Sequence, residues 1–149
     1  MRDELRELYQ EVILDHNKRP RNCYVMDCAN KSADGHNPLC GDTVKVYLRI
    51  EDGIISEISF QGAGCAICTA STSLMTESVK GKTVEEAKDI FDGFHHMLTG
   101  VAAEQGVELG KLQVFEGVRE YPVRVKCATL AWHTLNAAMD GDDDSVTTE

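Results

Sequence analysis

The sequence predicts a mixed fold in which helices accompany a small antiparallel sheet, and three observations support this prediction. Residues 43–50 alternate between apolar and polar side chains, as in a strand with one buried face. Asp52-Gly53 then favours a two-residue hairpin turn, so residues 54–61 are expected to return as the second strand. On either side of this hairpin, apolar residues recur at helical spacing.

The chain is expected to open with an amphipathic helix that Asp3 can cap. Its apolar residues follow the i, i+3, i+4, i+7, i+8 spacing of one helical face, namely Leu5, Leu8, Tyr9, Val12 and Ile13. The helix should end near His16-Asn17, because a proline follows at position 20. Residues 18–31 are expected to be irregular, and Ser32 to Asn37 should add a third strand at the edge of the sheet.

Two helices are expected directly after the hairpin. Residues 66–79 form a run of small side chains, which would allow a helix to pack closely on the sheet, and Gly81 ends it. Thr83 and Glu86 have the spacing of a capping box. This pair therefore predicts the start of the next helix, which should extend to about Thr99.

The C-terminal third is expected to contain a short helix around residues 112–118, an extended segment over residues 121–126 and a final helix from Cys127. The final helix has one apolar and small-residue stripe, formed by Cys127, Leu130, Ala131, Thr134, Leu135 and Ala138. Residues 140–149 contain almost no apolar side chain and are expected to be a disordered acidic tail. The rest of the chain, residues 1–139, is expected to form a single domain.

Composition limits the classes of function. The formal net charge of −10 argues against a nucleic-acid partner, whose phosphates would be repelled. No apolar run approaches the roughly 18 residues that a membrane helix needs, so no membrane association is expected. The N-terminus is charged from its second residue and lacks the apolar core of a signal peptide. These features predict a cytoplasmic protein.

The six cysteines point to metal binding or reactive-thiol chemistry, because a cytoplasmic protein rarely carries disulfides. Cys40 and Asp42 lie two residues apart, and side chains at that spacing in extended backbone point the same way. Cys65 and Cys127 are both expected at helix starts, where the helix dipole favours thiolates. Together these four residues would form a Cys3Asp tetrahedral site.

Each of these residues also has a plainer interpretation. A cysteine at a helix start is often a small buried apolar residue, and Asp42 could simply open its strand at a turn. From the residues alone, a metal site and ordinary packing both stay open.

Several motifs resemble the iron–sulfur cluster assembly family of IscU, SufU and the N-terminal domain of NifU. The resemblance spans residues 5–139 and is strongest in four stretches: residues 8–22, Asn37-Pro38-Leu39-Cys40-Gly41-Asp42, Gly62-Ala63-Gly64-Cys65, and Val125-Lys126-Cys127-Ala128. It implies an α+β fold, in which helices pack against a small three-stranded antiparallel sheet.

Within that family, the chain looks like the SufU branch, which is regarded as a zinc-dependent sulfur acceptor for a cysteine desulfurase of the SufS type. Lys126 stands where the IscU branch has a histidine, and extra residues lie around positions 94–112. The likeness implies that Cys40, Asp42, Cys65 and Cys127 hold Zn²⁺ and that Cys40 takes the sulfur. We further expect Arg124 to steer or hold the sulfur anion.

Two alternative functions are retained. The chain could be a scaffold that assembles and transfers a labile [2Fe–2S] cluster held by Cys40, Cys65 and Cys127, with aspartate suiting lability. Alternatively, zinc could be purely structural in an interaction module. In the sulfur-acceptor reading, a downstream iron–sulfur scaffold or acceptor protein would receive the sulfur.

The remaining cysteines and histidines are expected to have no role in that site. Cys68 completes a Cys-x-x-Cys pair with Cys65, which can be redox-active or bidentate, although we expect it to be a helix-packing residue. Cys23 and Cys28 are expected to be unligated. The adjacent His95 and His96 diverge on a helix and cannot easily share one metal. Trp132 and Tyr121 are expected to lie in the core.

Overall fold

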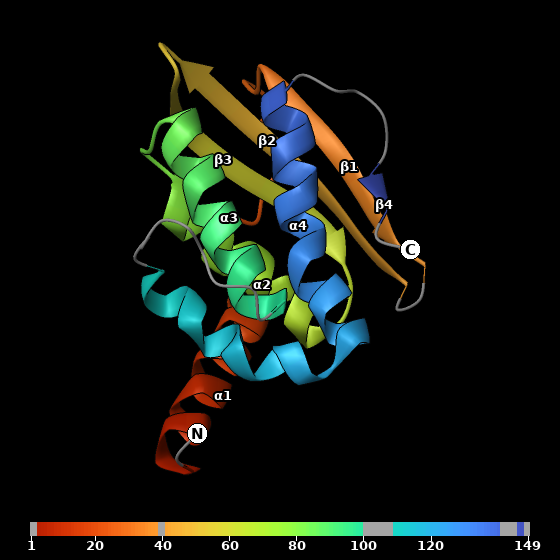
Figure 1. Cartoon of the computed structure of the whole chain (residues 1–149). Coiled ribbons are helices and arrows are strands. Elements are labelled where there is room, and N and C mark those ends of the chain that lie inside the picture. The colour runs from red at the N-terminus through yellow and green to blue at the C-terminus, as the bar shows by residue number, and fades with distance from the viewer. Residues whose placement is uncertain (1–2, 39–40, 100–108, 141–145, 148–149) are drawn as a thin grey trace.

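A computed structural model describes residues 3–38, 41–99, 109–140 and 146–147 of the chain (Figure 1). Helices and strands follow one another along these residues: α1 (Asp3–Lys18), β1 (Lys31–Asn37), β2 (Asp42–Glu51), β3 (Ile54–Ala63), α2 (Ala66–Val79), α3 (Val84–Thr99), the 3₁₀ helix η1 (Gly110–Glu120), α4 (Pro122–Asp140) and β4 (Val146–Thr147).

The sheet has the strand order β3-β2-β1-β4, with antiparallel pairing among the first three strands. This confirms the predicted three-stranded antiparallel sheet and its Asp52-Gly53 turn, where both residues adopt positive φ angles of 54° and 77°. The two-residue β4 pairs in parallel with β1 at Gly35 and His36, so β1 is not at the sheet edge there, contrary to our prediction. β4 falls within the predicted acidic tail, of which 141–145 and 148–149 lie outside the described residues.

α2 and α4 lie against one face of the sheet (Figure 1). Inward side chains of β2 and β3 are fully buried, among them Val46, Leu48 and Ile58. α4 packs on β1 and β2, α2 packs between α4 and β3, and α1 packs on the outer side of α2. Trp132 of α4 is buried among the rings of Phe91 and Phe94, as predicted for a core residue. The core therefore lies between the sheet and α2, α3 and α4.

The predicted capping box is confirmed at the start of α3. The Thr83 amide donates to Glu86 Oε1 and the Glu86 amide donates to Thr83 Oγ1, each at 3.1 Å. These bonds satisfy amides that the first helical turn leaves without partners.

The start of α4 differs from the prediction. Residues Pro122–Lys126 are helical rather than extended, because proline at the first helical position has a suitable φ and needs no amide partner. Cys127 therefore lies in the second turn of α4 and not at its start. Tyr121, expected in the core, is 51% exposed just before the helix.

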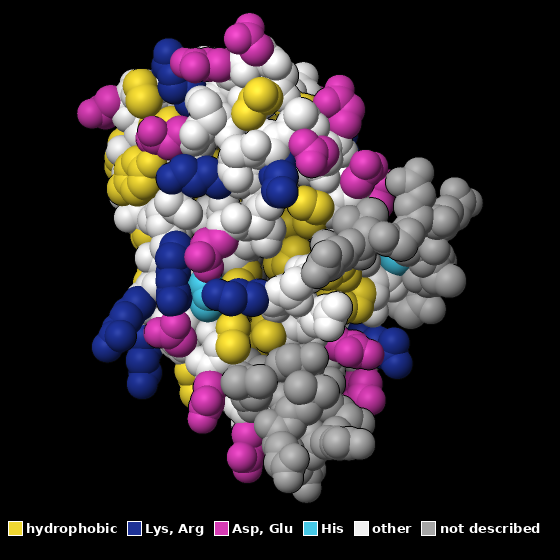
Figure 2. Space-filling view, turned by 90° about the vertical axis from the view of Figure 1, so that its left-hand side faces the viewer, with side chains coloured by type: hydrophobic (Ala, Val, Ile, Leu, Met, Phe, Trp, Pro, Cys, Tyr) yellow, Lys and Arg dark blue, Asp and Glu magenta, His cyan; other side chains and the backbone are white. Residues whose placement is uncertain are grey.

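Positive and negative side chains are interspersed on the face seen in Figure 2, and apolar side chains show only in small areas between them. None of the helices in the described part of the chain is both long and apolar enough to cross a membrane.

Candidate metal centre

Asp42 opens β2 and is fully buried, opposite Asn37 at the end of β1. The antiparallel register pairs these two residues across the turn. Asn37 Nδ2 donates to Asp42 Oδ2 and to Cys127 Sγ, each at 3.5 Å. The buried amide thus links a carboxylate on the sheet to a thiol on α4.

Cys65 is the residue that caps α2, and its extended backbone (φ −70°, ψ 166°) places it just outside the helix. Its amide donates to Asp42 Oδ1 at 2.8 Å, which fixes the carboxylate, while Cys65 Sγ lies 3.9 Å from Asp42 Oδ2. The preceding Gly64 makes this approach possible, because a Cβ at that position would lie 2.5 Å from Asp42 Oδ1. The prediction that Cys65 stands at a helix start is confirmed.

Cys127 completes a cluster of three candidate ligands. One ligand atom each from Asp42, Cys65 and Cys127 lies within 4.8 Å of the others. In tetrahedral zinc sites, bond lengths of about 2.3 Å to sulfur and about 2.0 Å to oxygen place ligands roughly 3.5 to 3.8 Å apart. The cluster is therefore near the size that one metal ion requires.

The chemistry of the three side chains also suits a cation. Two cysteines and one carboxylate form a mixed sulfur and oxygen set of the kind that Zn²⁺ accepts. Within the described residues, the buried carboxylate of Asp42 takes part in no ion pair. A bound cation would offset the cost of burying that charge. The residues present thus fit a metal ion of this class.

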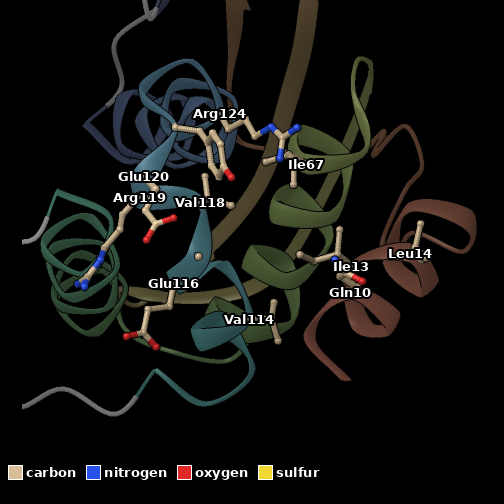
Figure 3. A pocket seen from close by; sticks show the side chains of 12 residues that line it. Gln10, Ile13, Leu14, Ile67, Val114, Glu116, Val118, Arg119, Glu120 and Arg124 are labelled. Carbon is tan, nitrogen blue, oxygen red and sulfur yellow. The ribbon is translucent and has the colours of Figure 1, made fainter. Parts of the chain in front are cut away.

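Cys40 and Arg124 are the other two predicted site residues. Cys40, the predicted fourth ligand and sulfur acceptor, lies outside the described residues. Arg124 is exposed, with its guanidinium carbon 4.8 Å from the ring centroid of Tyr121. It lines a cavity of about 540 Å³ among α1, α2, η1 and α4, where Figure 3 shows it beside Ile67, two residues after Cys65.

Cys23 and Cys28 are exposed, and neither belongs to the three-residue cluster. Cys68 is 3% exposed in the core, as predicted for a helix-packing residue.

Three histidines lie outside the three-residue cluster. His95 and His133 pack around Phe91. Burial lowers the pKa of His133, and His95 lowers it further. His16 is buried between α1 and α2.

Asn37 is the residue that the sequence reasoning missed. The signal that could have identified it is the hairpin register, since a strand over residues 32–37 paired with one from Asp42 places Asn37 directly opposite that carboxylate.

Comparison with known families gives a match over most of the chain. The NifU-like N-terminal domain family matches residues 8–141, which include Asp42, Cys65 and Cys127. The chain belongs to this family. The resemblance noted in the sequence is thereby confirmed, together with the fold that it implied.

Relatives of this NifU-like domain carry two different names. The zinc-dependent sulfurtransferase SufU of Bacillus subtilis is 38% identical over 128 residues, which cover 86% of each chain. The iron–sulfur cluster assembly scaffold protein IscU of Streptococcus pyogenes is 39% identical over 136 residues, 91% of this chain and 85% of the relative. A crystal structure from Fervidobacterium islandicum, of a protein named as a putative iron–sulfur cluster assembly scaffold protein for the SUF system (FiSufU), superposes with a TM-score of 0.83 at 37% identity, covering 89% of this chain and 97% of that one.

Proposed function

We propose that the protein acts in iron–sulfur cluster biogenesis as a zinc-dependent sulfur acceptor, which takes persulfide sulfur from a cysteine desulfurase. The observation that supports this proposal most directly is the convergence of Asp42, Cys65 and Cys127 within 4.8 Å. A relative named as a zinc-dependent sulfurtransferase matches over most of both chains, and Lys126 precedes Cys127 where the scaffold branch was expected to have histidine.

Asp42, Cys65 and Cys127 would hold the zinc ion, with Cys40 as the fourth ligand. When bound, Zn²⁺ supplies a charge that keeps cysteine ligands deprotonated at neutral pH without redox chemistry of its own. Backbone and side-chain amides of the chain orient these ligands. The Cys65 amide orients the carboxylate through Oδ1, and the Asn37 amide reaches both Oδ2 and Cys127 Sγ.

The transfer step would take place on Cys40. Its thiolate attacks the outer sulfur of the desulfurase persulfide, and a new sulfur–sulfur bond forms on this chain. The sulfur–sulfur bond of the donor breaks, and the desulfurase cysteine leaves as a thiolate. Arg124 would steer or hold the sulfur anion, since it is exposed and lines the cavity next to the first turn of α2. A downstream scaffold or acceptor protein would then take the sulfur.

A sulfur-transfer assay with a SufS-type desulfurase tests the proposal. Zinc-loaded protein should stimulate cysteine turnover and carry a persulfide on Cys40, whereas metal-free protein should not. Cys40→Ala should still bind the desulfurase but carry no sulfur, and Cys28→Ala, at an exposed cysteine, is the matched control that should behave like the unaltered chain. Full sulfur transfer by Cys40→Ala would exclude the assignment.

A scaffold for a labile [2Fe–2S] cluster is the second candidate, because relatives named as scaffold proteins are 39% and 36% identical. The cluster would then be cargo held by Cys40, Cys65 and Cys127. Purification without oxygen, followed by metal analysis and a visible spectrum, separates the candidates. Colourless protein with one zinc per chain supports sulfur transfer, whereas brown protein containing iron supports the scaffold.

A third candidate, a purely structural zinc ion in an interaction module, makes a different prediction. Chelation would then unfold the protein, and a variant that folds without metal would still transfer sulfur. Loss of transfer in such a variant would support a direct role for the metal centre.

A further inference from the structure

Cys65 and Cys68 lie in the same turn, and the proposed function gives a role to Cys65 but none to Cys68. Cys65 caps α2 and Cys68 is the third residue of that helix. Cys65 Sγ accepts a hydrogen bond from the Cys68 amide, at 3.4 Å between nitrogen and sulfur. Residues three apart on a helix are neighbours on its surface, so the two thiols belong to one turn.

The two side chains differ in access to solvent. Cys65 is half-buried, whereas Cys68 is 3% exposed within the core. A small oxidant that reaches this turn therefore meets Cys65 first, and Cys68 is available as the second thiol of the same turn. We propose that Cys65 and Cys68 form a dithiol that peroxides convert to an intrachain disulfide.

The reaction balances with one peroxide molecule as oxidant. Cys65 sulfur attacks one peroxide oxygen, the O–O bond breaks, and Cys65 becomes a sulfenic acid while one water leaves. Cys68 sulfur then attacks the Cys65 sulfur, the S–O bond breaks, and the hydroxyl leaves with the Cys68 proton as a second water. Two thiols together lose two electrons and two protons, and the peroxide is reduced to two waters.

Closing this disulfide requires a small movement. Cβ atoms three residues apart on a helix are about 5–6 Å apart, whereas a disulfide needs roughly 3.5–4.5 Å. Cys65 can supply this movement because its backbone is extended and lies outside the helix, directly after Gly64. The rival partner is Cys127, which belongs to a different helix and whose Sγ lies within 4.8 Å of Cys65 Sγ.

The disulfide would have a consequence for the metal centre, and this consequence rests on the proposed function. Oxidised Cys65 is no longer a thiolate ligand, so Asp42 and Cys127 would lose one sulfur of their set. Peroxide should therefore release zinc, and a dithiol reductant should restore zinc binding. Bound zinc should in turn slow the oxidation, because it occupies the Cys65 sulfur.

Peptide mapping without reduction gives a direct test. The background chain carries Cys23→Ser and Cys28→Ser, which remove two exposed thiols outside the three-residue cluster. Trypsin cleaves after Arg49, Lys80 and Lys126, so Cys65 and Cys68 share the peptide 50–80 while Cys127 lies in another. After one equivalent of hydrogen peroxide, peptide 50–80 of the metal-free chain should be lighter by two hydrogens and regain them with reductant.

The control variant is Cys68→Ala in the same background. Without the second thiol, peptide 50–80 should instead gain oxygen on Cys65, and excess peroxide should make this change irreversible. A cross-link between peptide 50–80 and the Cys127 peptide, or unchanged thiols in 50–80, would overturn the proposal. Zinc content, measured with a chromogenic chelator, is read separately. If the disulfide forms in a chain that never binds zinc, the proposed function fails while this inference stands.

Discussion

Asn37 places one buried amide against two of the candidate metal ligands. Its Nδ2 lies 3.5 Å from both Asp42 Oδ2 and Cys127 Sγ, and its side chain is fully buried. Groups that orient metal ligands in this way tune metal affinity, and their loss typically costs about 10- to 100-fold. Position 37 should therefore be sensitive to substitution even though amide groups rarely bind zinc.

We predict that Asn37→Ala weakens zinc binding by about 10- to 100-fold, since both the carboxylate and the thiol lose a donor. Competition with a chromogenic chelator measures the affinity. Asn30→Ala is the matched control: Asn30 also bonds a neighbouring strand, at Ile50, but lies away from the centre and should leave the affinity unchanged. Equal affinities for the unaltered chain and Asn37→Ala would contradict this role.

Gly64 provides a second prediction at the scale of single residues. A Cβ at Gly64 would lie 2.5 Å from Asp42 Oδ1, so Gly64→Ala should displace the carboxylate and lower both zinc affinity and stability, the latter by about 1–3 kcal/mol. At Gly62, a Cβ would instead meet the backbone of Thr43. Gly62→Ala should thus lower stability while the metal affinity of the folded protein changes little. A similar loss of affinity in both variants would argue against the specific contact.

The candidate ligands were predictable one by one from residue type and turn position, but their exact surroundings were not. Cys65 was expected at a helix start because Gly62-Ala63-Gly64 precedes a run of small residues. The predicted position of Cys127 at the start of its helix was wrong, because Pro122 is compatible with an extended segment but also suits the first turn of a helix, and here it begins α4. Asn37 was missed because its contacts depend on the register between β1 and β2 and on Cys127 of α4, which is 90 residues away in sequence.

At the scale of elements, a histidine joins α1 to α2. His16 is 2% exposed; its Nδ1 lies 2.7 Å from Ser73 Oγ, and its Nε2 lies 3.4 Å from Glu77 Oε1. The Arg21 amide also donates to Ser73 Oγ, so this hydroxyl can donate its own proton to His16 Nδ1. The neutral ring with its proton on Nε2 therefore fits the junction.

The junction predicts a pH dependence of stability. Burial lowers the pKa of His16 below 6.5, with a further lowering from Arg21, while Glu77 and Asp15 act in the opposite direction. Between the lowered value and 6.5, the unfolded chain binds more protons than the folded chain. The free energy of unfolding should therefore fall as the pH decreases below about 7, in the presence of chelator to exclude metal loss. Urea unfolding at several pH values measures this slope.

Two histidine variants make the test specific. His16→Gln should flatten the pH dependence, because it removes the group that takes up the proton on unfolding. His36→Gln, at an exposed histidine of β1, should leave the slope as it is. An unchanged slope in His16→Gln would mean that other groups set the acid sensitivity.

Secondary structure was most predictable where local chemistry determines it. The Thr83–Glu86 capping box and the Asp52-Gly53 turn involve residues close in sequence, and both were correctly predicted. The pairing of β4 with β1 was not predicted, because Val146–Thr147 is surrounded by polar residues and gives no strand pattern of its own. β4 pairs with β1, which lies far away in the sequence.

At the scale of the whole molecule, the candidate metal centre joins the sheet, α2 and α4. Its described ligands come from positions 42, 65 and 127, so the full set can converge only when the chain has folded. A metal ion that binds the folded chain alone must stabilise it, by about 2.7 kcal/mol at a free concentration 100 times its dissociation constant. For a chain of this length, 1 kcal/mol corresponds to roughly 2–4 °C in melting temperature.

We therefore predict that chelation lowers the melting temperature of zinc-loaded protein by several degrees and that added zinc restores it in a concentration-dependent way. Asp42→Ala removes one ligand, so its melting temperature should depend little on zinc. Lys88→Ala breaks an exposed ion pair with Asp140 at the C-terminal end of α4 and should keep the full zinc response. Calorimetry with and without chelator measures all three proteins. If Asp42→Ala responds to zinc as the unaltered chain does, the ion binds elsewhere, and the convergence of Asp42, Cys65 and Cys127 does not form the metal centre.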